Sequence, residues 1–522
     1  MKIITSKEMQ QLEDRAERNG ITSDALMQNA GRAVAQQMQG VLGSVADKKI
    51  VVLIGPGNNG GDGLVAAHYL KQFGADVTLY LCAERKADDE NLRQALDAGV
   101  LCMEATTDAE QEGLAQLLPG CDTVLDAIFG TGQSRYIGGV FLAVLSALNR
   151  NKKVKPAIQI VSVDLPSGLN GDSGEADPCT PFADYTITLG YPKRGLFATV
   201  GALHAGKVLV VDIGIPAELT KGLPCESLTD DDMRSLLPSR SPYAHKGTFG
   251  KVLVLAGSAN YIGAAYLCCG AALRAGAGLV TLASDRATQP VVAGLLPEAT
   301  YFHLPEASMG GTHPDSYKAL LDEAAGYDVF LAGCGLGLKE SAKTLALKTI
   351  FRLPHGYKTV LDADVLNYLA TIPNWWGRLP DDAVITPHPG EMARLCGLTI
   401  NEVHADRFNL ALHKAEEWNK TIVLKGANSI IASPHGALRI NCYANAVLSS
   451  AGTGDVLSGI IAGLVAQGLS FFDAACLGVF LHSKAAEALC SGLGDAGMLA
   501  SDLLPELPLA IKHLKETPQF VA

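Results

Sequence analysis

Residues 450–465 read S-A-G-T-G-D-V-L-S-G-I-I-A-G-L-V, a glycine-rich turn that leads into an apolar helix. The small residues of this helix predict close packing in a domain core. The free N–H groups at its start and the amides of 452–454 form a site suited to an anion. Asp455 could accept a proton from a hydroxyl there while the amides stabilise a phosphoryl group in transfer. The simpler alternative is that Asp455 only caps a buried helix.

The second half of the chain alternates short apolar runs with helical patterns. We predict strands at 252–256, 279–283, 329–332, 359–362, 384–386 and 422–424. Continuous apolar strands separated by helices are typical of a mostly parallel sheet that is covered on both faces. This half is therefore predicted to be an α/β domain.

The first half repeats this alternation, with predicted strands at 50–54, 77–81, 123–126, 158–164, 185–189 and 208–213 and a helix at 63–73. Two helices precede them, one with a capping box of Thr5 and Glu8 and one capped by Ser23. The pattern pauses near Pro216. We therefore expect α/β domains at 1–216 and 241–522, joined by a linker at 217–240.

Three loops of the first half follow predicted strands. The first reads G-P-G-N-N-G-G-D-G at 55–63 and matches G-x-G-x-x-G, but Pro56 and the missing acidic residue after the second strand argue against a hydride-transferring site. Asp126 and Asp164 each end a strand and precede glycines. Such loops could converge at the carboxyl edge of a parallel sheet. Alternatively, each aspartate caps the following turn.

Composition excludes several classes of protein. The 522 residues are 48 % hydrophobic and 18 % charged, which is a globular composition. The net charge of -12 argues against nucleic-acid and membrane partners. We find no signal peptide, no apolar run long enough to span a membrane, and twelve scattered cysteines without metal-ligand spacing. A cytoplasmic protein with reduced thiols is expected, and a homo-oligomer is the expected assembly.

The motifs of residues 5–215 carry a specific resemblance. L-M-x-x-A-G-x-A-V, N-N-G-G-D-G, D-A-I-F-G-T-G and V-D-L-P-S-G-L-N-G-D-S-G follow in this order. The series resembles the NAD(P)H-hydrate epimerase domain of the YjeF N-terminal type, which implies a Rossmann-like three-layer fold. It also implies that Asp164 contacts the hydrated nicotinamide as acid/base and that K⁺ is held by Asn59, Asp126 and Ser167. The implied substrate pocket consists of Asn58, Asn59, Gly60, Gly61, Asp62, Gly130, Thr131, Gly132, Gln133, Ser134, Arg135, Tyr136 and Asp164.

In that family a lysine is proposed as partner of the acid/base aspartate. Lys86, after the second predicted strand, is a candidate, but no motif surrounds it, and a solvated surface lysine is the favoured reading.

The second half resembles the NAD(P)H-hydrate dehydratase of the YjeF C-terminal type, which has a ribokinase-like fold. The resemblance rests on K-G-T-F-G at 246–250, T-P-H-P-G-E at 386–391, the turn at 450–455 and G-M-L-A-S-D at 497–502. Cys334 replaces a usual proline, and Ala451 a usual glycine. The implied contacts to the hydrated dinucleotide are Ala264, Gly335, His388 and Asp455, although His388 could instead be structural. The implied adenine-nucleotide site, with Mg²⁺ on the phosphates, consists of Lys425, Gly426, Ala427, Asn428, Ser429 and Gly454.

Together the two resemblances imply repair of hydrated NADH and NADPH (NADHX and NADPHX). The first half would interconvert the R and S epimers, and the second would dehydrate the S epimer while ADP becomes AMP and phosphate. ADP rather than ATP is expected because the fused form resembles bacterial and archaeal proteins. Two alternatives stay open: a small-molecule kinase with the same ribokinase-like core, and a first half that binds nucleotides without catalysis.

Overall fold

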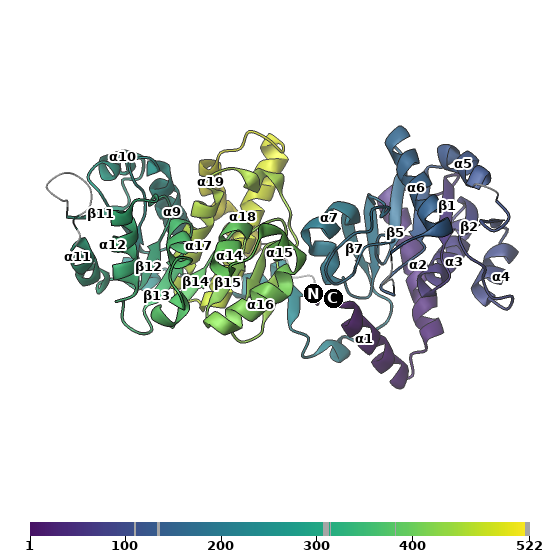
Figure 1. Cartoon of the computed structure of the whole chain (residues 1–522), viewed down its shortest axis with the longest axis horizontal. Coiled ribbons are helices and arrows are strands. Elements are labelled where there is room, and N and C mark those ends of the chain that lie inside the picture. The colour runs from purple at the N-terminus through teal and green to yellow at the C-terminus, as the bar shows by residue number, and fades with distance from the viewer. Residues whose placement is uncertain (109–110, 133–135, 306–312, 314, 382, 517–522) are drawn as a thin grey trace. The chain divides into compact units, whose positions relative to one another are not determined.

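The computed structural model describes residues 1–108, 111–132, 136–305, 313, 315–381 and 383–516. The chain divides into two compact units, Met1–Leu223 and Pro224–Ala522. In each unit helices pack around a central sheet of mainly parallel strands (Figure 1). This confirms the predicted α/β class for both halves.

The sheet of the first unit has seven parallel strands in the order β3-β2-β1-β4-β5-β6-β7. The strand order reverses between β1 and β4, and parallel sheets commonly bind ligands beyond the carboxyl ends of their strands at such a point. The strands are β1 (Lys49–Ile54), β2 (Asp76–Leu81), β3 (Leu101–Glu104), β4 (Thr123–Ala127), β5 (Gln159–Val163), β6 (Tyr185–Leu189) and β7 (Lys207–Val211).

The helices of this unit begin at local sequence signals. They are α1 (Ser6–Arg18), α2 (Ser23–Leu42), α3 (Asn58–Gln72), α4 (Glu90–Asp97), α5 (Glu112–Leu117), α6 (Gly139–Val154) and α7 (Thr199–Ala205). The capping box of Thr5 and Glu8 on α1 is confirmed. The prediction for α2 was off by one residue, because Thr22 rather than Ser23 accepts the capping hydrogen bond. Helix α3 begins at Asn58, before the predicted 63, so residues 58–63 of the predicted loop form its first turns.

The sheet of the second unit has ten strands in the order β11-β10-β9-β12-β13-β14-β15-β16-β17-β8. The seven strands from β11 to β15 in this order, which include β10 and β9, are parallel. Strands β15, β16 and β17 form an antiparallel meander. The strands are β8 (Cys225–Ser227), β9 (Lys251–Leu255), β10 (Leu279–Ser284), β11 (Thr300–His303), β12 (Val329–Ala332), β13 (Lys358–Leu361), β14 (Ala383–Ile385), β15 (Thr421–Leu424), β16 (Ile430–Ala432) and β17 (Leu438–Ile440).

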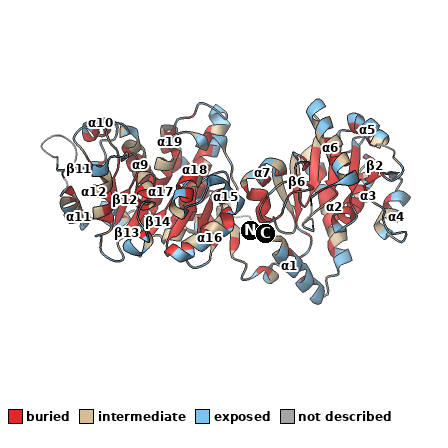
Figure 2. Cartoon of the chain, viewed as in Figure 1, coloured by how far each residue is buried: buried red, intermediate tan, exposed pale blue. Residues whose placement is uncertain are grey.

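Helices pack around this sheet, and α17 is buried in the hydrophobic core of the unit (Figure 2). They are α8 (Asp230–Ser235), α9 (Ile262–Arg274), α10 (Thr288–Leu295), α11 (Ser316–Ala324), α12 (Glu340–Ile350), α13 (Asp364–Leu369), α14 (Pro389–Cys396), α15 (Ile400–Ala405), α16 (Arg407–Trp418), α17 (Thr453–Ala466), α18 (Phe471–Leu493) and α19 (Leu503–Glu516). A Cβ atom at Gly459 would lie 2.2 Å from the Cys268 carbonyl oxygen, and one at Gly463 would lie 2.7 Å from that of Ala272. Glycine therefore lets α17 pack directly on α9, as its sequence predicts.

The expected linker at 217–240 contains regular structure. Its residues form a 3-10 turn (Ala217–Thr220), β8 and α8, and β8 pairs in parallel with β17. The units therefore divide between Leu223 and Pro224, and most of this segment belongs to the second unit. A three-residue edge strand has too few side chains to show a pattern in the sequence.

Among the described residues no helix is both long and apolar enough to cross a membrane.

Candidate active sites

The candidate site of the first unit is built around a buried aspartate on β4. Asp126 has no exposed surface, and its Oδ1 accepts a hydrogen bond of 2.5 Å from Ser167 Oγ. Its Oδ2 accepts bonds from the Ser167 amide at 2.8 Å and Ser162 Oγ at 3.1 Å. Burial raises the pKa of Asp126, and these bonds act in the opposite direction. The sequence-predicted pair Asp126 and Ser167 is thus in direct contact.

Asp164, which follows β5, forms a buried ion pair with Lys193, which follows β6. Lys193 is 1 % exposed and also donates to the Leu189 carbonyl at 3.1 Å. Asp164 Oδ1 accepts from the Leu189 amide at 3.2 Å and Thr188 Oγ1 at 3.3 Å. Its φ of 64° lies in the left-handed region, which a non-glycine residue adopts at a cost in free energy.

Lys193, not Lys86, is therefore the lysine beside the candidate acid/base. Lys86 lies on the surface before α4, in agreement with the favoured reading. The sequence analysis missed Lys193, although Gly190-Tyr-Pro-Lys193 follows a predicted strand as Asp164 follows another. Because β5 and β6 are parallel neighbours, the residues after their carboxyl ends lie side by side.

The first turns of α3 place two further predicted residues near Asp164. A Cβ atom at Gly130 would lie 3.3 Å from Asn59 Oδ1 and 3.4 Å from Asp164 Oδ2, so all three residues meet. Both polar atoms of the Asn59 carboxamide are buried and have no hydrogen-bond partner within the described chain. Burial, followed by the charges of Asp164 and Glu13, holds the pKa of Asp62 well above its usual range.

The other predicted pocket residues of this unit differ in exposure. Gly60 and Gly61 are buried in α3, whereas Asn58 and Gly132 are exposed and Thr131 is half-buried. Tyr136 is 89 % exposed, and Gln133, Ser134 and Arg135 lie outside the described residues. The turn before α3 is held by Arg85, which donates to the carbonyls of Gly55 at 2.9 Å and Gly57 at 3.1 Å.

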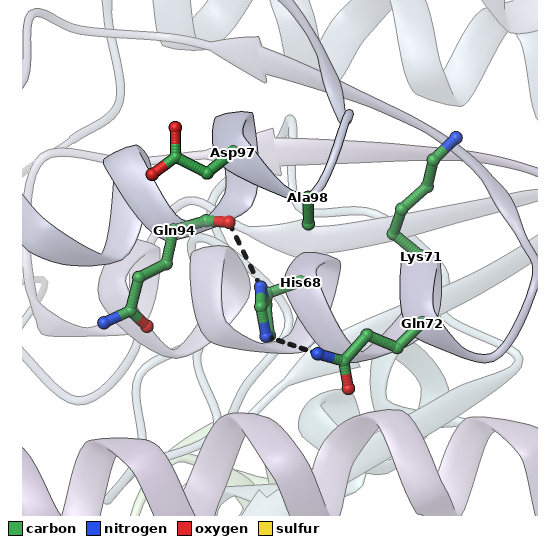
Figure 3. Close-up of a pocket in the computed structure, with 6 residues that line it drawn as sticks. All are labelled: His68, Lys71, Gln72, Gln94, Asp97 and Ala98. Atoms are coloured by element: carbon green, nitrogen blue, oxygen red, sulfur yellow. Dashed lines mark hydrogen bonds between the residues drawn. The ribbon is translucent and has the colours of Figure 1, made fainter.

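A separate hollow lies at the other end of α3 (Figure 3). His68 contacts the Gln94 carbonyl at 3.1 Å and the Gln72 side chain at 2.8 Å. The remaining lining residues are Lys71, Asp97 and Ala98. None of the predicted site residues lines this hollow, so we do not assign the chemistry to it.

In the second unit the loops after five parallel strands converge. Lys425, after β15, forms an ion pair with Asp362, after β13, with Nζ 2.7 Å from Oδ1. Asp362 is 1 % exposed, and its Oδ2 accepts a hydrogen bond from Ser458 on α17. Lys425 Nζ also lies 3.8 Å from Glu391 Oε2. Asp362 thus links the predicted nucleotide lysine to the helix that carries Asp455.

Asp455 lies in the first turn of α17, whose N-cap residue Gly452 has a φ of 92°. Gly452 has no side chain that could accept a hydrogen bond from the first turn of α17. The backbone amides of this turn are therefore free of a capping side chain. Burial and then the negative charge of Asp362 raise the pKa of Asp455 to about 7. A carboxyl group with such a pKa can accept a proton near neutral pH and release it again.

Ala264 and Gly335, two of the predicted substrate contacts, lie next to each other. A Cβ atom at Gly335 would lie 2.7 Å from the Ala264 Cβ, and the φ of 64° there favours glycine. Gly335 lies after β12, next to Cys334, a fully buried thiol that hydrogen-bonds Asp455 and so lowers its pKa.

His388 has a structural role in this unit. It is the N-cap of α14, and its Nδ1 accepts the Gly390 amide at 3.0 Å. Nε2 lies 3.4 Å from Glu391 Oε1, and half of the His388 side chain is exposed. Burial and the charge of Lys425 lower the pKa of His388, which favours the neutral ring. Because Nδ1 accepts the Gly390 amide, the ring proton lies on Nε2. Capping of α14 therefore leaves an N–H donor at the site.

The predicted nucleotide residues line a cavity of about 430 Å³ between β15, α17 and α18. Lys425, Gly426, Ala427, Ser429 and Gly454 all contribute to it, whereas Asn428 has a φ of 53° and is buried beside it. A Cβ atom at Gly454 would lie 3.5 Å from Lys425 Nζ, which places the lysine at the N-terminus of α17.

Arg407, which the sequence analysis missed, holds the loop that begins at Lys425. It is 2 % exposed and donates to the Ala427 carbonyl at 3.0 Å and the Lys425 carbonyl at 3.4 Å. No sequence motif marks this arginine, because its partners are backbone carbonyls.

The chain is similar to known proteins over both units. A family model described as NAD(P)H-hydrate dehydratase matches residues 252–509, and one described as YjeF-related protein N-terminus matches residues 23–195. A bifunctional NAD(P)H-hydrate repair enzyme from Moorella thermoacetica is 39 % identical, over 100 % of this chain and 98 % of its own length. The Escherichia coli protein of that name is 34 % identical, over 94 % and 89 %.

A solved ribokinase-like superfamily protein from Enterococcus faecalis is 25 % identical and covers 56 % of this chain and 98 % of its own, with a TM-score of 0.50. The second unit thus has the expected ribokinase-like fold. The full-length similarity to the Moorella thermoacetica protein extends through both units. The chain therefore belongs to the family of bifunctional NAD(P)H-hydrate repair enzymes.

Proposed function

We propose that this chain repairs hydrated nicotinamide cofactors in two steps, one in each unit. The observation that carries the proposal is that each unit pairs a buried aspartate with a lysine at the carboxyl edge of its sheet. The first unit interconverts the R and S epimers of NADHX and NADPHX. The second unit dehydrates the S epimer while ADP is converted to AMP and phosphate.

In the first step Asp164 acts as the acid/base. The substrate carries a hydroxyl at C6 of the nicotinamide ring, next to the ring nitrogen. Inversion at C6 requires one group that moves a proton, whether the hydroxyl leaves and returns or the ring opens. Lys193, Thr188 and the Leu189 amide hold the Asp164 carboxylate in place for this task. Asn58–Asp62 and Gly130–Tyr136 would line the substrate pocket.

The same site fits a potassium ion. Asn59, Asp126 and Ser167 would hold it, because they offer amide, carboxylate and hydroxyl oxygens to a hard cation. The buried Asn59 carboxamide lacks a partner within the described chain, and a bound cation would supply one to its oxygen. The ion would supply positive charge to this site. Replacement of K⁺ by Li⁺ in the assay should lower the epimerisation rate.

In the second step Asp455 removes the proton of the C6 hydroxyl, whose oxygen then attacks the terminal phosphorus of ADP. The phosphoryl group moves to that oxygen, and AMP leaves. The ring nitrogen's lone pair next expels phosphate, and loss of a proton from the neighbouring carbon restores the double bond. The amides of Gly452–Gly454 and Lys425 stabilise the charge that develops during the transfer. Ala264, Gly335 and His388 would contact the substrate.

The nucleotide would lie in the cavity lined by Lys425–Ser429 and Gly454. Mg²⁺ would neutralise its phosphates, and such ions take most of their ligands from phosphates and water rather than from a protein cage.

The test uses the full chain with a mixture of hydrate epimers and ADP or ATP. Return of nicotinamide absorbance follows dehydration, and chiral separation follows epimerisation. The Asp164→Asn variant should dehydrate only the S epimer of the mixture. The Asp455→Asn variant should dehydrate neither epimer. If Asp455→Asn restored the cofactor at the wild-type rate, this mechanism would be wrong. A small-molecule kinase would instead accumulate a stable phosphorylated product.

A further inference from the structure

The inner wall of the nucleotide cavity carries two buried polar atoms without a partner in the described part of the chain. They are Oδ1 of Asn441, which follows β17, and Nε2 of His482, on α18. Both residues line the cavity, and they are 2 % and 6 % exposed. Buried polar atoms are rarely left unpaired in native proteins, so a ligand atom is the expected partner.

Asn441 presents an acceptor to the cavity. Its Nδ2 donates to Ser483 Oγ at 2.6 Å, and its backbone amide donates to the Ser429 carbonyl at 2.9 Å. These two bonds fix the orientation of the carboxamide, because the first engages the nitrogen and the second anchors the backbone. Only the carbonyl oxygen of the side chain remains unpaired, and it can only accept.

His482 presents a second acceptor. Burial lowers the pKa of His482 to about 4, and the charge of Lys425 acts in the same direction, so the ring is neutral at physiological pH. Its hydrogen bond to the Thr453 backbone favours the charged ring and is therefore one that the ring donates. Since Nε2 is unpaired, the donor is Nδ1–H, and Nε2 carries a lone pair.

The remaining lining suits a phosphate group with a flat heterocycle beside it. Lys425 and Gly454 mark the phosphate end of the cavity. Leu448, Leu457 and Val479 supply apolar surface along the rest of it. Pockets of this type bind an apolar ring by its faces and fix its identity with a few polar atoms.

We propose that Asn441 Oδ1 and His482 Nε2 read the nucleotide base and select a 6-aminopurine. An exocyclic amine has two N–H donors, one for each acceptor, whereas the 6-oxo group of inosine or guanosine would set a third acceptor against them. The inference rests on the proposed ADP-dependent function and adds a residue-level reason why an adenine nucleotide is used.

The experiment compares ADP with inosine diphosphate, which carries oxygen where ADP carries the amine. For the wild-type chain, kcat/KM with ADP should exceed that with inosine diphosphate by about 100-fold, because the analogue would leave buried acceptors without a hydrogen-bond donor. His482→Phe and Asn441→Leu should each raise KM for ADP about tenfold and leave KM for inosine diphosphate nearly unchanged. His435→Phe, on the exposed turn between β16 and β17, is the matched control and should keep the wild-type ratio.

Thermal unfolding with each nucleotide measures the same preference without turnover. A larger rise in melting temperature with ADP than with inosine diphosphate supports the base reading even if the dehydratase step itself were disproved. Equal use of both nucleotides by the wild-type chain would overturn it. If a variant lost kcat equally with ADP and inosine diphosphate, and the ratio of the two kcat/KM values stayed as in the wild type, these residues would have a purely structural role. That result would also overturn the proposal.

Discussion

Replacement of Lys193 by methionine tests the reasoning about the first unit most directly. Methionine is similar in length to lysine and keeps the apolar stem, but it removes the charge that faces Asp164. Lys193 is 1 % exposed, and the Asp164 side chain is 9 % exposed, so water cannot replace the lost partner. Removal of one partner from a buried ion pair costs about 3–5 kcal/mol.

For a unit of this size, each kcal/mol lowers the melting temperature by about 2–4 °C, so Lys193→Met should lower it by roughly 6–20 °C. The epimerisation rate should fall by about 100-fold or more, the usual contribution of a positioned acid/base. Chiral separation of the hydrates gives this rate, and dehydration of the S epimer by the second unit serves as an internal reference. Lys86→Met removes the same charge from an exposed site and is the matched control.

The double variant Lys193→Met with Asp164→Asn distinguishes charge from packing. Removal of both charges eliminates the uncompensated carboxylate, so the double variant should recover most of the melting temperature that Lys193→Met loses. Its epimerisation rate should stay low. If Lys193→Met epimerised at the wild-type rate, or melted like Lys86→Met, the ion pair would not be the feature that holds Asp164.

Three further predictions concern both units. Dehydratase kcat/KM should fall as pH drops through about 7, because Asp455 must be charged to act as a base and its pKa is raised to about 7. Asp362→Asn removes a negative charge that raises the pKa of Asp455, so in the pH profile of this variant the loss of kcat/KM should begin at a lower pH than in the wild type. Arg407→Met removes the donors to the nucleotide loop and should raise KM for ADP about tenfold in initial-rate assays, with kcat little changed. Gly130→Ala would press a Cβ atom against the Asn59 carboxamide and should slow epimerisation by up to about 100-fold, whereas Gly120→Ala, with no atom within 4 Å of the new Cβ, should leave it unchanged.

The sequence by itself determined the alternation of strands and helices and the location of the main chemical groups. Most parallel strands lie within a residue or two of their predicted bounds, because a buried strand is a continuous apolar run that ends at a turn. The strands that were missed are β3 and β11, at the outer ends of their sheets, and β8, β16 and β17, three of the four strands with three residues. They bury few side chains or are too short to produce a pattern.

Only the tertiary structure decided which groups meet. Lys193 joins Asp164 because β6 is the parallel neighbour of β5, and Lys425 joins Asp362 although 63 positions separate them in the sequence. In the same way β8 belongs to the second sheet because it pairs with β17. Caps and periodicity depend on residues within one or two turns of each other, so a sequence states them directly. Partners across a sheet depend on strand order, which local patterns leave open and which packing of the whole unit sets.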